Sequence, residues 1–534
     1  HTAYRRQRQM CIRDRAIGDF LDRELDDFLW IKNENEKDLI AAIAELPAQH
    51  TFHTKPYKHQ AASFYIGACL NSFLYFLDMG AGKTFISLNL IKYYKNMDKV
   101  TKTLVVVPNV LNIAGWKEEI SIHAPNLKHV GIYEGNIESR FNSLKEEGDV
   151  YVINYDGLQT LMTSFVEVPG KTASGKKKKK RKIDEKLVKS FVQRFQMVIF
   201  DEIHFIKNSD TMRYKLCKKI AKNCSYRYGL TGTPFGRDPH DLWAEFNVID
   251  NGETLGTTLG IFRGAFFNTK SNGFGIVHEF KKEMKRKLNK TIQHRSLRYE
   301  DKEFEDLPSK VETDVPLMMA PDALMYYEQL KKESYEKDDE EVRTNFYAKW
   351  RQICSGFVYE NIEDDELGKT KFAMEFSKTE KLDAVEILIE DMPTDSKMVI
   401  FHVFNKSGEM IVERLKKLKI PFAAVNSTVK DKVADYNRFK NNPKCKILVV
   451  NIGSGNAGLN LQNANYVINY EPTDRPIWYK QAMKRVYRTG QKKRCYFYHF
   501  HVKRSVEDKV LNFIKEGKSL FDALIEGKIA LREL

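Results

Sequence analysis

Cysteines are scarce in this 534-residue chain, which contains seven of them, and no two form a C-x-x-C pair. Their spacing matches no zinc-binding pattern, and their odd number does not suit a closed set of disulfides. We therefore expect reduced thiols in a reducing compartment. The pattern argues against a zinc module and against a disulfide-stabilised secreted domain.

A long uninterrupted apolar run is missing as well, and no secretory signal is recognisable. The longest apolar stretch extends from Phe64 to Leu77, but Asn71 and Ser72 interrupt it. Because it leads into a glycine-rich loop, we interpret it as a helix followed by a buried strand and not as a membrane span. The first 15 residues are basic and lack periodicity, so we expect either a nucleic-acid-binding arm or a non-native extension there.

Basic residues outnumber acidic ones by 87 to 72, which gives a net charge of +15. This excess predicts a polyanionic partner, either a nucleic acid or an anionic membrane surface; a solvated basic surface without a partner is the alternative. Hydrophobic residues make up 42% and charged residues 30% of the chain, as is typical of a globular protein. The length predicts two to four domains.

Strand-like apolar runs alternate with helical stretches in two separate regions of the chain. Together with continuous apolar runs such as LVVV and MVIF, this alternation predicts parallel sheets covered by helices, that is, the α/β fold class. The expected strands are Phe73–Leu77, Leu104–Val107, Val150–Asn154, Met197–Phe200 and Tyr228–Leu230 in the first region, and Met398–Phe401, Phe422–Val425, Ile447–Val450, Tyr466–Asn469 and Cys495–His501 in the second.

We expect five segments along the chain. They are an N-terminal lead-in (1–50), a first α/β lobe (51–250), helical protrusions with a linker (251–375), a second α/β lobe (376–505) and a C-terminal helix (506–534). The first lobe contains a basic insertion (170–187). Seven consecutive basic residues at 176–182 cannot pack, so we expect an exposed, mobile loop that could contact phosphates or act as a nuclear-import signal.

The segment DMGAGKT (78–84) has the features of a phosphate-binding loop. Gly80 and Gly82 allow a tight turn, while Lys83 would neutralise phosphate charge and Thr84 would offer a hydroxyl to Mg²⁺. The helix after this loop would point its positive end at the phosphates. Leu77 stands at the first position of the pattern G-x-x-x-x-G-K-[ST], so a chance glycine-rich turn is the alternative.

Asp201 and Glu202 directly follow one of the expected buried strands. A carboxylate at the carboxyl end of a strand beside a phosphate loop suits Mg²⁺ coordination. We therefore expect Asp201 to bind the metal and Glu202 to orient or deprotonate the attacking water. A solvent-facing acidic pair is the alternative for this segment in isolation.

Two further segments are weak signals alone but fit the same site. Thr231, Gly232 and Thr233 close the next strand, and their hydroxyls could relay between an ATP site and a second lobe. Gln60, in the segment YKHQ, could read the adenine edge with its amide.

In their order along the chain, these segments resemble the Swi/Snf-like branch of superfamily 2 helicase-related ATPases, over about residues 55 to 515. Ala81, Ile203 and Asn456 depart from the residues usual in that family, and none of these departures removes a catalytic group. The matching segments are HQ (59–60), DMGAGKT (78–84), LVVVPNVLNIAGWKEE (104–119), VINYDGL (152–158), DEIHFIKN (201–208), LTGTP (230–234), VIFHVFN (399–405), GSGNAGLNL (453–461) and QAMKRVYRTGQ (481–491).

The resemblance implies two RecA-like lobes that use ATP and Mg²⁺. It implies that Arg485 and Arg488 are arginine fingers, and their i, i+3 spacing would put both on one helix face. The remaining residues that its motifs assign to ATP binding are Ala81, His204, Gly458 and Gln481.

The resemblance also implies sequence-tolerant contacts with the phosphate backbone of duplex DNA. Trp116 and Trp478 could stack on bases, but we expect both to be packed in the interior. The candidate DNA-binding residues are Pro108, Asn109, Asn154, Tyr155, Phe404, Asn405, Gly455 and Asn460.

The predicted function is an ATP-dependent double-stranded-DNA translocase that remodels DNA or displaces bound protein, acting as a monomer without a membrane partner. One alternative is a strand-separating superfamily 2 helicase on DNA or RNA. Another is a nucleic-acid-binding scaffold with a regulatory ATP site. We expect the cytoplasm of a bacterial or phage-infected cell, or the nucleus if the source is eukaryotic.

Overall fold

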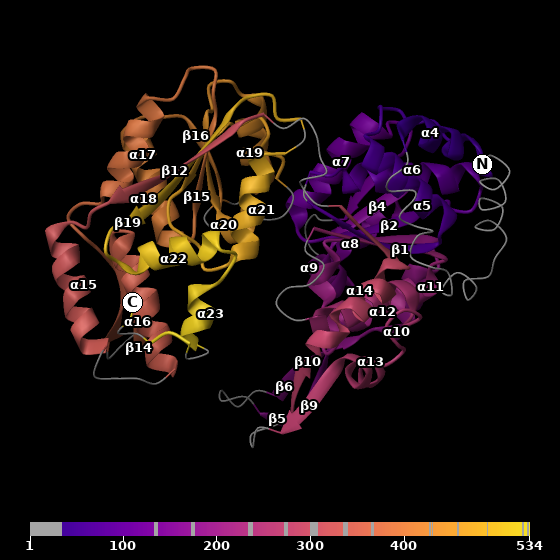
Figure 1. Ribbon diagram of the computed structural model, residues 1–534, viewed down its shortest axis with the longest axis horizontal. Helices are drawn as coiled ribbons and strands as arrows, with labels where there is room; N and C mark the ends of the chain where they lie inside the picture. Colours follow the sequence, from indigo (N-terminus) through magenta and orange to yellow (C-terminus); the bar gives the residue numbers. More distant parts are fainter. Residues whose placement is uncertain are drawn as a thin grey trace. The chain divides into compact units, whose positions relative to one another are not determined.

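The computed structural model divides into two compact units, His1–Glu305 and Asp306–Leu534 (Figure 1). The boundary falls within the segment 251–375, which the sequence assigned to protrusions and a linker. The structure describes residues 35–78, 80–132, 137–171, 177–232, 239–271, 276–299, 308–334, 340–364, 368–426, 429, 431–455, 459–488, 490–525, 528–530 and 533.

Unit 1 is built on a parallel sheet whose described strands follow the order β11-β1-β8-β7-β2-β4-β3. The central strands are short and mostly apolar, as strands buried on both faces must be. Their bounds are β1 (Ser72–Leu77), β2 (Thr103–Val107), β3 (His129–Ile132), β4 (Val150–Asn154), β7 (Met197–Asp201), β8 (Tyr226–Thr231) and β11 (Ser296–Tyr299).

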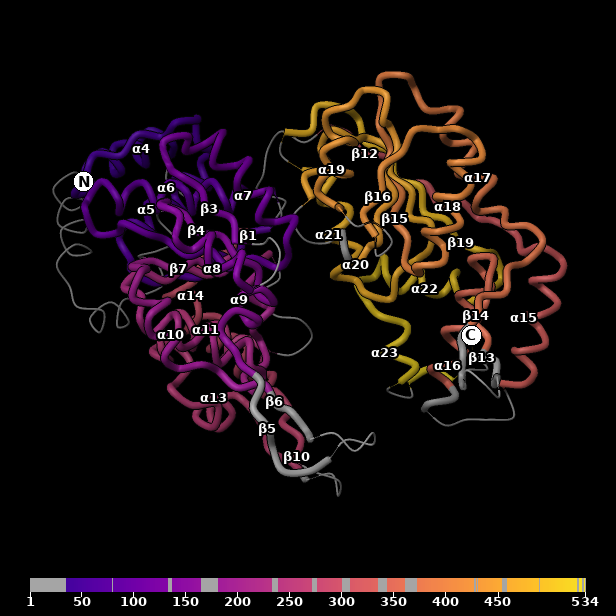
Figure 2. The backbone as a smooth tube through the Cα atoms, turned by 180° about the vertical axis from the view of Figure 1, so that it is seen from behind, coloured from indigo at the N-terminus to yellow at the C-terminus, as the bar shows by residue number. Residues whose placement is uncertain are grey.

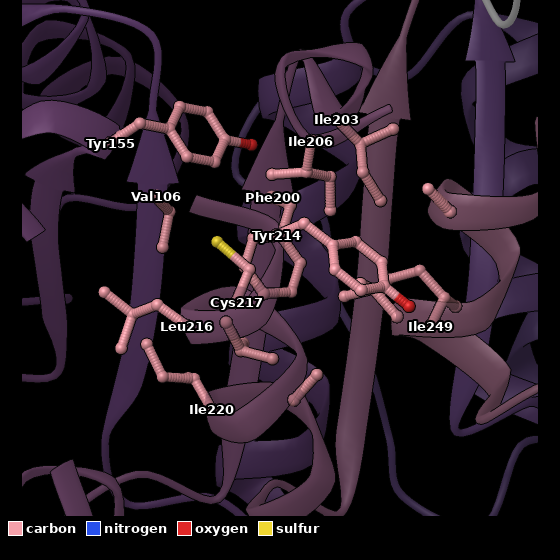
Figure 3. Packing of buried hydrophobic residues seen from close by; sticks show 14 of the residues in the cluster. Val106, Tyr155, Phe200, Ile203, Ile206, Tyr214, Leu216, Cys217, Ile220 and Ile249 are labelled. Carbon is pink, nitrogen blue, oxygen red and sulfur yellow. The ribbon is translucent and has the colours of Figure 1, made fainter. Parts of the chain in front are cut away.

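Helices cover both faces of this sheet, because alternate residues of one strand enter different cores. Leu104 and Val106 of β2 join one apolar cluster, and Val105 and Val107 join the other. Figure 3 shows part of the first cluster, in which residues of η1 (Ile203–Ile206) and α11 (Met212–Asn223) gather around the sheet. The other helices of the unit are α4 (Glu36–Ala44), α5 (Lys58–Cys69), α6 (Lys83–Asn96), α7 (Val110–His123), α8 (Ile137–Lys145), α9 (Tyr155–Leu161), α10 (Glu185–Val192), α12 (Leu242–Asp250), α13 (Leu259–Phe266) and α14 (Lys285–Gln293).

Unit 2 contains a second parallel sheet, with the order β12-β19-β18-β15-β17-β16 among the described strands. The predicted α/β class with two parallel-sheet lobes is therefore confirmed. The strands are β12 (Lys310–Leu317), β15 (Met398–His402), β16 (Phe422–Val425), β17 (Ile447–Asn451), β18 (Tyr466–Asn469) and β19 (Cys495–Val502).

The helices that the structure describes in unit 2 are α15 (Pro321–Ser334), α16 (Glu340–Cys354), α17 (Glu380–Glu390), α18 (Asn405–Lys417), α19 (Lys432–Asn441), α20 (Ile452–Gly455), α21 (Pro476–Val486), α22 (Val506–Lys515) and α23 (Leu520–Ile525). Several of them pack in two apolar clusters. One cluster joins the sheet to α17 and α18, and the other joins α15, α16, α22 and α23. Ser505 caps α22 by accepting a hydrogen bond from the backbone N–H of Glu507, as the sequence SVED predicts.

Three antiparallel hairpins correct the predicted organisation. The basic insertion is not a plain loop: β5 (Thr163–Lys171) pairs with β6 (Lys177–Ile183). The segment 251–375 is not mostly helical, because it contains the hairpins β9 (Phe267–Ser271) with β10 (Ile276–Phe280) and β13 (Phe357–Asp364) with β14 (Gly368–Glu375), besides β11 and β12. Figure 2 shows β10 projecting from the same end of unit 1 as α13.

Among the residues that the structure describes, no helix is both long enough and apolar enough to span a membrane.

Candidate functional site

The phosphate loop leaves the carboxyl end of β1 and enters α6. Gly80 and Gly82 have φ angles of +88° and +79°, a region that residues with a Cβ rarely adopt. Gly82 is the N-cap of α6 and has no side chain to occupy the first N–H groups of the helix. Lys83 Nζ donates to the carbonyl of Leu77 at 2.9 Å. The turn therefore presents helix N–H groups and an ammonium group together, as phosphate binding requires.

His59 and Gln60 support this loop from α5. Nε2 of His59 lies 2.9 Å from the carbonyl oxygen of Ala81, and Nε2 of Gln60 donates to the same oxygen at 3.3 Å. The Gln60 side-chain carbonyl accepts a hydrogen bond from the N–H of Tyr57 at 3.0 Å. The Gln60 side chain is 6% exposed and supports the loop through these bonds, while its contact with adenine stays a prediction.

The acidic pair lies at the carboxyl end of β7, as the sequence predicts. Asp201 ends the strand, and Glu202 comes next in the left-handed region with a φ of +49°. Thr231 at the end of β8 donates its hydroxyl to Glu202 Oε2 at 3.2 Å. Nδ1 of His204 lies 2.9 Å from Thr231 Oγ1 and 3.3 Å from Glu202 Oε2. The buried Glu202 carboxylate is thus held by the two neighbours that the sequence assigned to coupling and ATP binding.

Asp201 is held by two residues that the sequence did not assign to this role. The indole Nε1 of Trp116 donates to Asp201 Oδ2 at 3.1 Å, and the hydroxyl of Tyr155 donates to the backbone carbonyl of Asp201 at 3.1 Å. Burial raises the pKa of Tyr155 well above its ordinary value, so the hydroxyl stays protonated and remains a donor. Trp116 is 2% exposed, which agrees with its expected interior packing.

The residues that would hold Mg²⁺ suit that ion. Thr84 and Asp201 offer a hydroxyl and a carboxylate, the hard oxygen donors that Mg²⁺ takes together with water and substrate phosphates. Among the described residues no three His, Cys, Asp or Glu side chains gather as a metal-binding cluster.

Glu245 lies buried near this site. Its carboxylate oxygens have no hydrogen-bond partner among the described residues, and burial, together with Asp241, raises its pKa well above the ordinary value. Lys207 opposes that shift. Burial therefore favours the protonated, uncharged form of the Glu245 carboxyl group.

Two of the candidate DNA-binding positions of unit 1 cap helices at the carboxyl edge of the sheet. Asn109 lies after β2 and caps α7, where its side chain accepts a hydrogen bond from Asn112 N at 3.3 Å. Asn154 ends β4 and is the N-cap of α9. Both are partly exposed, but Pro108 and Tyr155 are buried. The buried side chain of Tyr155 is therefore not placed to contact DNA, and its hydroxyl holds the backbone carbonyl of Asp201 instead.

In unit 2 the candidates again lie after strand ends. Phe404 is the N-cap of α18, Asn405 is exposed at its first position, and Gly455 ends α20 after β17. The backbone of Asn460 is held on both sides by the hydroxyl of Tyr436, which donates to its carbonyl at 2.8 Å and accepts from its N–H at 3.1 Å. Parallel strands bring these positions to one edge of the sheet.

The two candidate arginine fingers do not share a helix face. Helix α21 ends at Val486, so Arg485 lies in its last turn and Arg488 lies in the turn beyond it. Gln491 closes this turn by donating to Ala464 O at 2.8 Å and to Val486 O at 3.2 Å. The prediction that both arginines share one helix face was wrong, because α21 ends at Val486 and does not reach Arg488.

Of the remaining candidate residues for ATP binding and coupling, the structure describes some and not others. Gln481 is buried within α21, and Gly232 comes directly after β8. Thr233 and Gly458 lie outside the described residues. The Trp478 ring stacks with Arg475, whose guanidinium carbon is 4.4 Å from the ring centroid.

Comparison with known families gives two matches that together span most of the chain. The family model of the SNF2-related domain matches residues 30–357, and that of the helicase conserved C-terminal domain matches residues 380–490.

The curated relatives are distant and longer. An uncharacterized ATP-dependent helicase of Mycoplasma genitalium is 25% identical over 83% of this chain and 39% of its own length. The transcription regulatory protein SNF2 of Saccharomyces cerevisiae is 25% identical over 81% of this chain and 25% of its length. The chain thus spans about two fifths or less of these relatives.

Solved structures show a looser likeness. The Sulfolobus solfataricus SWI2/SNF2 ATPase core, solved in complex with dsDNA, is 22% identical and covers 90% of this chain and 96% of its own, with a TM-score of 0.40. Our fold assignment rests on the strand orders of the two sheets instead.

Proposed function

Since the chain belongs to the SNF2-related family of helicase-like proteins, we propose that it hydrolyses ATP and uses the energy to move along double-stranded DNA. The proposed outcome is the remodelling of DNA or the displacement of bound protein. The relatives' names, which include an ATP-dependent helicase, support ATP use.

One observation carries the proposal more than any other: Asp201 is bonded to the two elements that begin at the candidate DNA-binding loops of unit 1. Trp116 belongs to α7, which Asn109 caps, and Tyr155 is the first residue of α9, which Asn154 caps. A phosphate contact at either helix start would act on the proposed metal ligand through one side chain. Hydrolysis that depends on DNA requires such a connection.

The residues of unit 1 suit phosphoryl transfer by position and charge. Lys83 would place its ammonium group on the β- and γ-phosphates, and Thr84 and Asp201 would hold Mg²⁺, which neutralises the developing phosphate charge. Glu202 would orient the attacking water, because Thr231 and His204 fix its carboxylate in one position. We propose that Arg485 stabilises the transferring phosphoryl group; arginine fingers of this kind contribute roughly 10³–10⁵ in turnover.

The positive net charge of the chain suits a protein that binds the phosphate backbone of a nucleic acid. A net charge of +15 favours a polyanion, and contacts to phosphates carry no base identity. We therefore propose a duplex-DNA partner bound without sequence preference. We propose that the protein acts as a monomer in a bacterial cytoplasm and displaces protein bound on the DNA.

Steady-state ATP hydrolysis tests the proposal, measured without nucleic acid and with duplex DNA, single-stranded DNA and RNA. We expect duplex DNA to give the strongest stimulation, and Lys83→Ala to abolish it. Lys92→Ala is the matched control, because Lys92 lies on the same helix but donates to Thr51 O. Preference for single strands or RNA would indicate a strand-separating helicase instead. Binding without hydrolysis would indicate a scaffold.

A further inference from the structure

Arg351 on α16 contacts two loops at the carboxyl edge of the sheet of unit 2. Its Nη1 pairs with Asp474 Oδ2, and its Nη2 donates to the carbonyl of Pro472 at 2.5 Å. The same guanidinium lies over the ring of Phe404, with its central carbon 5.3 Å from the ring centroid. One side chain therefore bridges the loop after β18 and the loop after β15.

The bridge is buried and its charge is compensated. Arg351 is 5% exposed, and Tyr347, one helical turn earlier, donates its hydroxyl to Asp474 Oδ1. Burial raises the pKa of Tyr347 well above its ordinary value, so the hydroxyl remains a donor. A guanidinium presents several donors in a rigid plane and can hold a carboxylate and a carbonyl at once, which a lysine ammonium on a flexible stem cannot do in the same geometry.

A second contact ties the same two loops together. Glu471 accepts a hydrogen bond from Val403 N at 2.7 Å and another from the hydroxyl of Ser407 on α18. The segment from Glu471 to Asp474 is thus fixed to the start of α18 on one side and to α16 on the other. Little freedom is left to the residues directly after Asp474.

The chain then enters the helix that carries Arg485. Helix α21 begins at Pro476, two residues after Asp474, and Arg485 lies in its last turn. Because a helix is stiff over eleven residues, its direction is set where it starts. A shift at Asp474 therefore moves Arg485 as well.

We propose that Arg351 is a positioning residue that sets the direction of α21, and so the place of Arg485, relative to the candidate DNA loop at Phe404. This inference deepens the proposed function and rests on the role that it gives to Arg485. Nothing in the motifs of the sequence pointed to Arg351, which lies in the segment predicted as protrusions and linker.

A double-mutant experiment on the full chain tests the inference, with ATP hydrolysis measured at saturating duplex DNA. We expect Arg351→Lys to lower kcat about 10- to 100-fold, as a misplaced catalytic group does. KM for ATP should stay unchanged, because Arg485 acts on the transition state. In an Arg485→Ala background, Arg351→Lys should lower kcat no further.

Arg414→Lys is the matched control, because the ion pairs of Arg414 join α18 to Asp383 and Glu386 on α17. We expect it to leave kcat unchanged in both backgrounds. A second variant covers the case in which Arg351→Lys lowers the melting temperature. Asp474→Asn removes the charge from the other end of the bridge, and we expect it to cause the same loss of kcat.

The outcomes separate the two claims. The positioning role is overturned if Arg351→Lys and Asp474→Asn both keep the kcat of the unchanged protein. It is also overturned if the kcat loss of Arg351→Lys multiplies with that of Arg485→Ala. Either result leaves the proposed function intact. If Arg485→Ala itself leaves kcat unchanged, the finger assignment in the proposed function fails, and the inference fails with it.

Discussion

The indole nitrogen of Trp116 donates a hydrogen bond to the carboxylate of Asp201 at 3.1 Å. These residues are 85 positions apart and belong to α7 and β7. The bond connects a helix that starts at a candidate DNA loop with the proposed magnesium ligand. Removal of this hydrogen-bond donor should therefore change the rate of ATP hydrolysis without removing a proposed contact with the nucleotide.

Trp116→Phe should keep much of the packing of the ring and remove the donor. A hydrogen bond to a charged group contributes about 1.5–3 kcal/mol, so we expect kcat in the presence of duplex DNA to fall roughly 10- to 100-fold. Hydrolysis measured over a Mg²⁺ titration checks this. Trp243→Phe is the control, since Trp243 donates to Gly256 O at 2.9 Å, away from the site. Equal kcat in the two variants would contradict the assigned role of Trp116.

Thr231→Val should release the Glu202 carboxylate. The substitution keeps the shape and removes the hydroxyl that bonds Glu202 Oε2 and faces His204. We expect DNA-stimulated hydrolysis to fall by about tenfold or more, with ATP affinity retained. The matched control is Thr103→Val in β2, where the buried Thr103 hydroxyl has no partner among the described residues. A stimulated rate in Thr231→Val as high as in the control would count against the coupling role.

Gly82→Ala should disable the phosphate loop. An added Cβ would lie 2.1 Å from Gln60 Nε2, at a φ of +79°. The backbone alone costs about 1–2 kcal/mol, so we expect ATP affinity to fall roughly tenfold or more, as nucleotide titration would show. Gly264→Ala, in α13, meets nothing within 4 Å and should leave ATP binding unchanged. Normal ATP affinity in Gly82→Ala would show that the loop tolerates a side chain there.

His402 should make the stability of unit 2 depend on pH. Burial lowers its pKa from 6.5 to about 4, and one ring nitrogen bonds Phe404 O at 2.8 Å. The unfolded chain binds the proton first as pH falls, so the stabilisation is complete above pH 6.5 and is lost on the way to pH 4. The difference amounts to about 3 kcal/mol.

Urea unfolding between about pH 7.5 and 5 measures this dependence. His402→Asn, which keeps a donor near Phe404 O, should flatten the slope of stability against pH. A slope as steep as that of the unchanged protein would show that another group is responsible.

The basic strand β6 should contribute to DNA affinity through charge. Each phosphate contact adds about 0.9 to the slope of log affinity against log salt. Lys178→Gln with Lys180→Gln should therefore reduce that slope by up to about 1.8. Lys416→Gln with Lys417→Gln, in the last turn of α18, is the control. Equal slopes in both double variants would exclude a role of β6 in DNA binding.

Most of the strands that the sequence predicted are buried along nearly their whole length. Val150–Asn154, Phe422–Val425 and Tyr466–Asn469 match β4, β16 and β18 to the residue, because uninterrupted apolar runs are what two covered faces require. The edge strands β3, β11 and β12 were missed. The residues of β12 are all exposed or partly exposed, and its polar sequence KVETDVPL carries no periodic apolar signal.

At the site, short-range features could be predicted and long-range contacts could not. The sequence indicates Gly80 and Gly82 because their backbone has positive φ angles, and it indicates Asp201 because an apolar strand directly precedes it. Trp116 and Arg351 act through partners 85 and 123 residues away, and only the folded sheet edges bring them together. A tryptophan in the helix after a candidate DNA loop was the one available signal for Trp116.

Displacement of a third strand from triplex DNA is the decisive measurement, because a motor that moves along duplex DNA removes the third strand without separating the duplex. We predict ATP-dependent displacement from a duplex without single-stranded ends, absent in Lys83→Ala and retained in Lys92→Ala. Duplex-stimulated ATP hydrolysis with no displacement on any length of duplex would contradict translocation.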